Sequence, residues 1–361
     1  MNDANELISF IASMSGEGNL RVEENLGEGY VRLRVSEAER RQAKHDIQHV
    51  EDIVIEMLRN ARDAGADKVY LATTKEDGVR TLVFLDNGSG VPQDMQERIF
   101  DARVTSKLES LKMDRWGVHG RGMALFSIKQ NTDEACVVAS DVDLGSVFKV
   151  SVATDRLGER ADQSSWPQAV KDEDGHYVCA RGPHNIIRAA CEFALAELRA
   201  CDVYLGSPSE IAATLHAQAS SRLDASRLLF IDDEAELPVV DRLGLASDAE
   251  DFIRICSGLG LEMSERTAHR ILAGQIKPVR GVTARLLRER DSSSHASAPV
   301  DLAKDRRGLR IAKDDMAKFS RAVERDFNDL ASRYYLNLCG DPKIRVSRDR
   351  ITVTFDLAKE E

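Results

Sequence analysis

Three polar side chains are spaced so that a single face of a helix would carry all of them. Glu56, Asn60 and Asp63 stand at positions i, i+4 and i+7, in a segment whose apolar residues recur at intervals of three and four. A carboxylate at the edge of an apolar stripe can accept a proton from water, and an amide oxygen can ligate a hard cation such as Mg²⁺. Taken alone, the same spacing also describes a solvated helix face.

A second polar segment follows a predicted strand. Residues Asp86 to Gly90 read DNGSG and come directly after the β-rich run 79–85. An Asp at the end of a strand can accept a hydrogen bond from an exocyclic amine, and glycines allow the backbone to approach a flat ligand closely. By itself, the segment is more simply described as an Asn-Gly turn.

Glycines also precede a later predicted helix. Residues 117–122 read GVHGRG and lead into that helix. Backbone N–H groups at a helix N-terminus and the helix dipole both favour an anion there. No Gly-Lys-Ser/Thr follows, which excludes a Walker P-loop, and no strand directly precedes the glycines, which disfavours a dinucleotide-binding fold.

The elements that must position these groups alternate between helices and strands. Gly65 ends the first helix as a left-handed cap, and Glu76-Asp77-Gly78 is a turn signal between two strands that we expect to pair antiparallel. This order predicts an α+β fold with a mixed sheet rather than a doubly wound parallel sheet. The expected elements are helix 36–64, strands 68–74 and 79–85, loop 86–121, helix 122–130, strands 134–139 and 146–153, and an irregular segment 155–180.

The order of the motifs resembles the Bergerat-fold ATPases. Glu-x-x-x-Asn comes first, Asp-x-Gly-x-Gly second, and a glycine-rich loop that opens a helix third. This superfamily, also called GHKL, includes gyrase, the ninety-kilodalton heat-shock chaperone, sensor histidine kinases, MutL and the B subunit of topoisomerase VI. The resemblance covers residues 40–155. It implies a Bergerat-fold ATPase sandwich, in which a mixed sheet backed by helices carries an ATP site.

The resemblance also implies roles for individual residues. Glu56 looks like the general base that activates the attacking water, Asn60 like the Mg²⁺ ligand, and Asp86 like the acceptor of the adenine amine. Residues 91–116 look like the lid over ATP; Lys107 there either meets a phosphate or is simply solvated. The residues implied to bind ATP and Mg²⁺ are Asn60, Asp63, Asp86, Gly88, Gly90, Lys107, Gly117, His119, Gly120, Arg121, Gly122 and Ser146.

Two members of the superfamily are most similar over particular segments. Asp63-Ala64-Gly65-Ala66, together with the run RVTSKL at 103–108, looks most like MutL. The helix expected at 185–200 and strand 202–205 resemble the B subunit of topoisomerase VI, in which a helix-two-turns-helix module follows the ATPase domain. We therefore expect an ATPase domain 1–206, a helical module 207–290 similar to helix-two-turns-helix, a flexible linker 291–300, and a C-terminal part 301–361 with helix 311–338 and strands 344–346 and 351–355.

Basic residues gather near the end of the predicted helical module. Residues 261–290 hold seven Lys and Arg against three Glu, a local charge of +4 in a chain whose formal net charge is −11. Such a surface could contact the phosphates of double-stranded DNA, and the lack of aromatic residues argues against stacking on single strands. An ordinary solvated helical surface fits the same composition.

Composition favours a soluble cytoplasmic protein. No apolar run is long enough to span a membrane, the N-terminus lacks the basic start of a signal peptide, and the six cysteines include no C-x-x-C pair. We therefore predict a Mg²⁺-dependent ATPase in which ATP changes the association of two protomers, or of this chain with a second, different protein, in a DNA transaction. The alternative is a kinase-like or nucleotide-regulated protein-interaction module with no DNA role; Glu56 favours hydrolysis over phosphotransfer.

Overall fold

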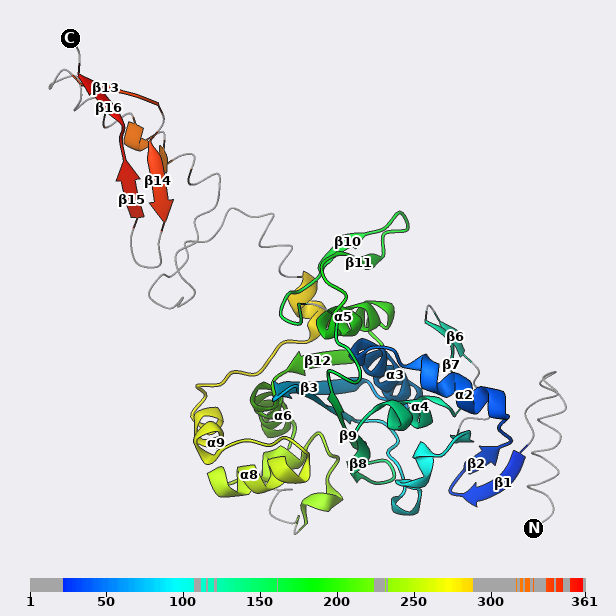
Figure 1. Cartoon of the computed structure of the whole chain (residues 1–361). Coiled ribbons are helices and arrows are strands. Elements are labelled where there is room, and N and C mark those ends of the chain that lie inside the picture. The colour runs from blue at the N-terminus through cyan, green and yellow to red at the C-terminus, as the bar shows by residue number, and fades with distance from the viewer. Residues whose placement is uncertain are drawn as a thin grey trace. The chain divides into compact units, whose positions relative to one another are not determined.

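The computed structural model of the chain divides into two compact units, Met1–Asp291 and Ser292–Glu361 (Figure 1). The residues that it describes are 22–106, 112–114, 116–119, 122–160, 162–223, 231, 233–287, and short stretches between 316 and 359.

A five-stranded mixed sheet forms the centre of the first unit, in the order β12-β3-β4-β9-β8. Its four adjacent strands β3, β4, β9 and β8 are antiparallel, so the predicted pairing of the first two strands is confirmed. Strand β12, far along the chain, joins β3 in parallel. The bounds are β3 Lys68–Glu76, β4 Val79–Asp86, β8 Glu134–Ser140, β9 Ser146–Ala153 and β12 Asp202–Gly206.

Both faces of this sheet are covered by apolar side chains. In β3, Val69 and Leu71 point into one buried cluster, whereas Tyr70 and Ala72 point into another on the opposite face. Helices on the first face include α2 Glu37–Asp46, α3 Val50–Asp63, α4 Ala124–Asn131 and α5 Ile186–Ala196. The predicted α+β sandwich, a mixed sheet backed by helices, is therefore confirmed.

The single helix predicted over 36–64 is wrong. Ile47 has an extended backbone, so the chain forms α2 and then α3. Each helix has its own N-terminal signal: the Ser36 side chain accepts from the Glu39 N–H, and the Asp52 carboxylate accepts from the His49 N–H at 2.9 Å. After this break, α2 contributes Glu39, Gln42 and Asp46 to the wall of the cavity described below.

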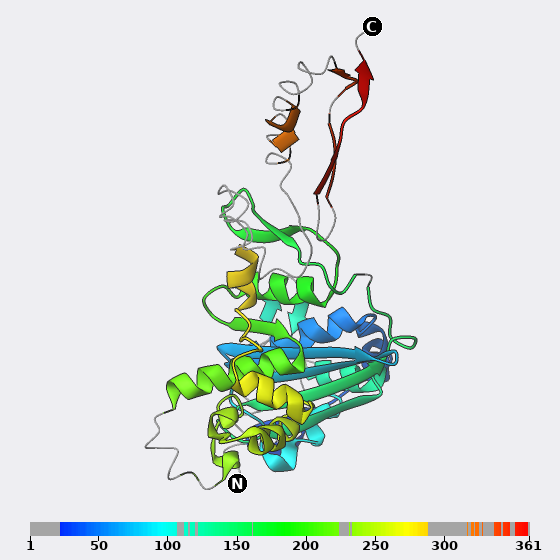
Figure 2. The same cartoon turned by 90° about the vertical axis from the view of Figure 1, so that its left-hand side faces the viewer.

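The second face of the sheet is covered by residues that follow β12 (Figure 2). Two 3₁₀ turns interrupt the helical pattern expected after residue 207, because Pro238 and Gly244 punctuate the chain there. The helices pack directly on the sheet, and the predicted boundary at 206 stays a prediction. The elements are α6 Pro208–Arg222, η3 Glu234–Glu236, η4 Arg242–Leu245, α8 Ala249–Gly258 and α9 Glu265–Leu272.

Several short strands lie where irregular chain was expected. The segment 155–180 contains a hairpin of β10 and β11, which extends beyond α5 (Figure 1). The predicted loop 86–121 contains two 3₁₀ turns and three strands. The bounds are β1 Val22–Gly27, β2 Tyr30–Leu33, η1 Gln93–Met95, η2 Arg98–Phe100, β5 Val104–Thr105, β6 Lys112–Asp114, β7 Gly117–His119, β10 Gln168–Lys171 and β11 Tyr177–Arg181.

The second unit contains two antiparallel strand pairs. Strand β13 Leu336–Leu338 pairs with β16 Leu357–Lys359, and β14 Lys343–Val346 pairs with β15 Ile351–Thr354. The two strands predicted here are confirmed, whereas the helix predicted to 338 is wrong over its last three residues, which form β13. The predicted linker 291–300 lies outside the described residues.

Within the described part of the chain, no helix has the length and apolarity needed to cross a membrane.

Candidate functional site

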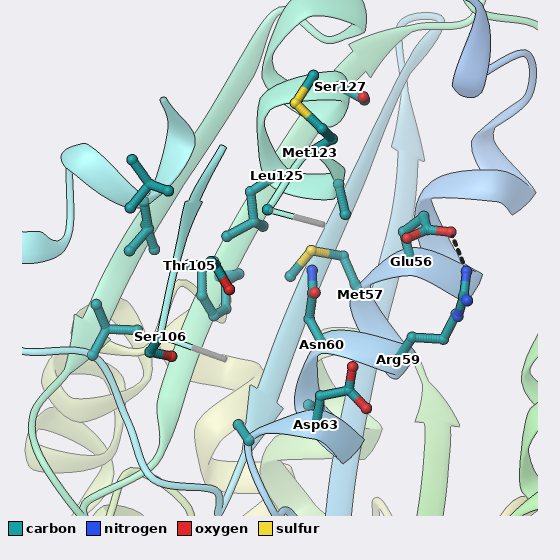
Figure 3. A pocket seen from close by; sticks show the side chains of 18 of the residues that line it. Glu56, Met57, Arg59, Asn60, Asp63, Thr105, Ser106, Met123, Leu125 and Ser127 are labelled. Carbon is teal, nitrogen blue, oxygen red and sulfur yellow. Dashed lines mark hydrogen bonds and ion pairs between the residues drawn. The ribbon is translucent and has the colours of Figure 1, made fainter. Parts of the chain in front are cut away.

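One side of α3 faces the sheet, and another borders a cavity. Ile53, Val54 and Leu58 are fully buried in the first core cluster. Asn60 and Asp63 lie one turn apart along the cavity wall, with Glu56 one turn earlier (Figure 3). Gly65, at φ +77°, ends the helix in the predicted left-handed conformation.

The cavity has a volume of about 480 Å³, which is within the usual size range of small-molecule sites. Its walls come from α2, α3, the end of β4, β5, the start of α4, and β9. It brings together residues that are far apart in the sequence. The predicted site residues that line it are Glu56, Asn60, Asp63, Asp86, Gly90, Gly122 and Ser146.

Asp86 lines the cavity at the end of β4. It is buried at the last position of β4, and its Oδ1 accepts the Gly88 N–H at 2.8 Å. Ser146 stands directly opposite it on β9, and the Ser146 Oγ accepts from the Ser140 hydroxyl at 3.2 Å. The carboxylate and the hydroxyl therefore border the same end of the cavity from two paired strands.

The glycines around Asp86 are required by close contacts within the chain itself. Gly90 has φ +71°, and a Cβ there would lie 1.7 Å from the Asp141 carbonyl oxygen. Gly145 has φ +78°, and its Cβ would lie 2.2 Å from the Asp86 carbonyl oxygen. The segments around 86–90 and 141–145 thus lock together through one glycine each, a packing role that the sequence did not indicate.

Asn60 offers polar atoms to the cavity. Its Nδ2 is buried and has no hydrogen-bond partner among the described residues. A buried amide without a partner costs free energy, so a polar ligand at this position would relieve the cost. The unpartnered group is an N–H donor, so it suits a ligand atom that accepts a hydrogen bond, such as a phosphate oxygen. The predicted role of Asn60 as the Mg²⁺ ligand, which would use the amide oxygen, stays a prediction.

A network of ion pairs connects Glu56 to a distant part of the chain. The Arg59 Nη1 donates to the Glu56 Oε1 at 2.7 Å, and the Arg59 Nε donates to the Asp114 Oδ2 at 3.0 Å. Arg62 also donates to the Asp114 Oδ2, at 3.1 Å. Burial would raise the pKa of Asp114, but the Trp116 N–H and these guanidinium groups hold it below its usual value. The sequence analysis missed this network.

The described walls of the cavity carry an excess of negative charge. Glu39 and Asp46 of α2 line it, although neither was predicted, and they add to the carboxylates of Glu56, Asp63 and Asp86. Among the described lining residues, Arg59 is the only basic one. An anionic ligand in this cavity would therefore need additional positive charge.

The predicted phosphate loop and lid are described only in part. Lys107, Gly120 and Arg121 lie outside the described residues, and Gly117 and His119 are described only as part of the backbone of β7. Gly122 precedes α4 with φ +67°, and a Cβ there would lie 2.7 Å from the Val104 carbonyl oxygen. Trp116 stacks against Phe193, with ring centroids 6.1 Å apart, and lines the cavity.

Comparison with known families agrees with this geometry. Residues 47–143 match the family described as histidine kinase-, DNA gyrase B- and HSP90-like ATPase. A search of curated proteins gives no match to the chain. The chain therefore carries an ATP-binding domain of the GHKL superfamily, and the predicted superfamily is confirmed. Its closer similarity to MutL or to the B subunit of topoisomerase VI stays a prediction.

Proposed function

We propose that this protein is a Mg²⁺-dependent ATPase whose nucleotide cycle drives a conformational or dimerisation switch, in a transaction on double-stranded DNA. The observation that carries the proposal is that Glu56, Asn60, Asp86 and Ser146 all line one cavity. The first three lie within the segment 47–143 that matches the ATPase family, and Ser146 follows it by three residues. In the proposed site, Asn60 ligates Mg²⁺, Asp86 accepts the adenine amine, and Glu56 is the general base.

The proposed reaction is hydrolysis of the terminal phosphate. The Glu56 carboxylate accepts a proton from water as the water oxygen bonds to the γ-phosphorus of ATP. The bond from that phosphorus to the bridging oxygen breaks, and ADP leaves with its electron pair. When bound at Asn60, Mg²⁺ would supply positive charge beside the phosphates. The excess of carboxylates on the described walls supports this requirement for a cation.

Asp86→Asn should abolish the preference for adenine. The wild-type carboxylate can accept a hydrogen bond from the exocyclic amine of adenine, which guanine lacks at the same edge. An Asn side chain could instead turn its own NH₂ group toward that amine, so that two donors would face each other. We expect a loss of about 1–3 kcal/mol in ATP binding, the cost of an unmade buried hydrogen bond. Calorimetry with ATP and GTP measures both affinities.

Asp77→Asn is the matched control for this measurement. Asp77 lies in the exposed turn at the other end of β4, with φ +47°, a conformation that Asn also adopts. The control should bind ATP as the wild type does. Equal wild-type affinities for ATP and GTP, unchanged by Asp86→Asn, would show that Asp86 does not read the base.

The proposed contact with DNA is supported by the exposed basic residues near α9. Arg266, Arg270, Lys277 and Arg280 are all exposed, and none of them forms an ion pair with another described residue. The helices α8 and α9 are joined by the short segment 259–264, in which Gly260 has φ +68°. Two helices joined by a glycine-containing turn are a common way to present a helix to DNA.

Reversing three of these charges should abolish duplex binding and leave ATP hydrolysis intact. We expect wild-type affinity to fall by about 0.9 log units per log unit of salt for each neutralised phosphate. The variant Arg266→Glu/Arg270→Glu/Arg280→Glu removes three such contacts. Fluorescence anisotropy with a labelled duplex, at several salt concentrations and with and without ATP, measures the effect.

A control variant with the same change of net charge at another surface distinguishes a local contact with DNA from general repulsion between a more acidic protein and DNA. Lys44, Arg181 and Arg199 are exposed and lie outside the basic segment, so their reversal to Glu should lower affinity much less. If the wild type binds no duplex at low salt in either nucleotide state, the DNA role is wrong. The nucleotide switch would then act on a protein client.

A further inference from the structure

Arg59 is nearly inaccessible to solvent, although it carries a permanent charge. Its side chain is 3% exposed, and it lies one helical turn after Glu56 on α3. A buried guanidinium is stable only where carboxylates and hydrogen-bond acceptors surround it. Two carboxylates do so here, and they belong to different parts of the chain.

The two carboxylates contact different nitrogen atoms of the guanidinium. The Arg59 Nη1 donates to the Glu56 Oε1 at 2.7 Å, as the dashed line in Figure 3 shows. The Arg59 Nε donates to the Asp114 Oδ2 at 3.0 Å, and Asp114 is the last residue of β6. Because the guanidinium is planar and rigid, the position of Asp114 fixes the direction in which Nη1 reaches Glu56.

We propose that Arg59 is a positioning residue that orients the Glu56 carboxylate, keeps it ionised, and ties it through Asp114 to the segment expected to form the ATP lid. This inference rests on the proposed role of Glu56 as general base. A base must be ionised and aimed before it can accept a proton from water. A fixed guanidinium provides both conditions, because a neighbouring positive charge favours the ionised carboxylate.

Several other charged groups lie near the ion pair of Arg59 and Glu56. Arg62 donates to Asp114, and it also donates to the Asp63 Oδ1 and to the Glu197 Oε1, at 3.0 Å in both cases. Arg62 therefore shares its helix and its partner Asp114 with Arg59 and is somewhat more exposed, at 11% against 3%, but no described hydrogen bond or ion pair joins it to Glu56. The other titratable groups that line the cavity on neighbouring elements are Tyr30, Glu39, Asp46 and Asp86.

The test is the pH dependence of ATP hydrolysis by the full chain. For Arg59→Gln we expect kcat to fall by about 10- to 100-fold, by analogy with the loss caused by removing the hydrogen-bond partner that orients a metal-ligating side chain. ATP affinity should change by less than about threefold, since binding does not use the base. The pH at which the rate reaches half its maximum on the acid side should move upward, because Glu56 loses the charge that keeps it ionised.

Arg59→Lys separates charge from geometry. Lysine keeps the positive charge but lacks the rigid fork, so kcat should fall while the acid-side midpoint stays near that of the wild type. This variant also serves if Arg59→Gln does not fold, which thermal unfolding and ATP binding will show. An unchanged kcat in Arg59→Lys would overturn the geometric part of the proposal.

Arg62→Gln is the matched control, and its acid-side midpoint should stay at the wild-type value. If Arg59→Gln does not shift the midpoint, or if Arg62→Gln shifts it equally, Arg59 has only a structural role. In a Glu56→Gln background, Arg59→Gln should cause little further loss of rate. Wild-type hydrolysis by Glu56→Gln itself would instead show that the proposed base is wrong, which keeps the two failures distinguishable.

Discussion

Glu56→Gln is expected to bind ATP with nearly wild-type affinity and to hydrolyse it about 10²- to 10⁴-fold more slowly, the range that a general base contributes. Gln has almost the same shape as Glu, and its carbonyl oxygen can still accept from Arg59, so the cavity wall should be preserved. It cannot accept the proton of the attacking water at neutral pH. Phosphate release measures the rate, and calorimetry measures the affinity.

Glu51→Gln is the control for this substitution. Glu51 is another glutamate of α3 and is buried, but its Oε1 accepts from the Arg160 N–H and from the Gln163 side chain, and it does not line the cavity. Its replacement should leave the hydrolysis rate within about threefold of wild type, as expected for a residue that does not touch the reacting atoms. Wild-type hydrolysis by Glu56→Gln would contradict the assignment.

The same variant tests the proposed switch. A chain that binds ATP but does not hydrolyse it should accumulate in its ATP-bound state, which makes a change in association measurable at equilibrium. Light scattering of Glu56→Gln with and without ATP should therefore show an increase in mass with ATP. An identical mass in both conditions would remove homodimerisation from the proposal and leave association with a different protein or a conformational change within one chain.

Local patterns were sufficient to predict several of the polar residues that line the cavity. Glu56, Asn60 and Asp63 share a helix, where spacing alone fixes which face they occupy, and Asp86 ends a strand whose apolar run is unmistakable. Antiparallel neighbours β3 and β4 are joined by a short turn, so their pairing also follows from adjacent sequence. Each of these inferences needs only a few consecutive residues.

Contacts between distant residues could not be predicted in this way. Arg59 and Asp114 are separated by 55 positions, and nothing in the type or spacing of either residue indicates the other. Glu39 and Asp46 reach the cavity only because the chain breaks at Ile47, which turns α2 relative to α3. That break had a readable signal in Asp52, whose carboxylate caps the following helix, but the apolar stripe of α3 obscured it.

The hairpin of β10 and β11 shows a second reason for a missed element. Its strands are short and half-exposed, so they lack the alternating apolar pattern that marks a strand. The turn Asp172 to Gly175 was nevertheless a local signal, because the Asp172 carboxylate accepts from the Asp174 and His176 N–H groups. Turn chemistry was therefore the better indicator than hydrophobicity here.

Among substitutions that add a single methyl group to the described cavity wall, Gly90→Ala is expected to cause the largest loss of ATP binding. The left-handed conformation at φ +71° costs an Ala about 1–2 kcal/mol. In addition, the new Cβ would lie 1.7 Å from the Asp141 carbonyl oxygen, so one of the two segments must move. Either movement displaces the wall beside Asp86, and we expect ATP affinity to fall by at least about tenfold, equivalent to about 1.4 kcal/mol.

Gly78→Ala separates the effect of backbone conformation from that of the collision. Gly78 has φ +80°, but nothing lies within 4 Å of the position its Cβ would take. This control should lower the free energy of unfolding by about 1–2 kcal/mol and leave ATP affinity unchanged. Calorimetry and thermal unfolding of both variants provide the comparison. If Gly90→Ala bound ATP as tightly as Gly78→Ala, the contact between Gly90 and Asp141 would not shape the end of the cavity beside Asp86, and the role proposed for Asp86 would lose its structural support.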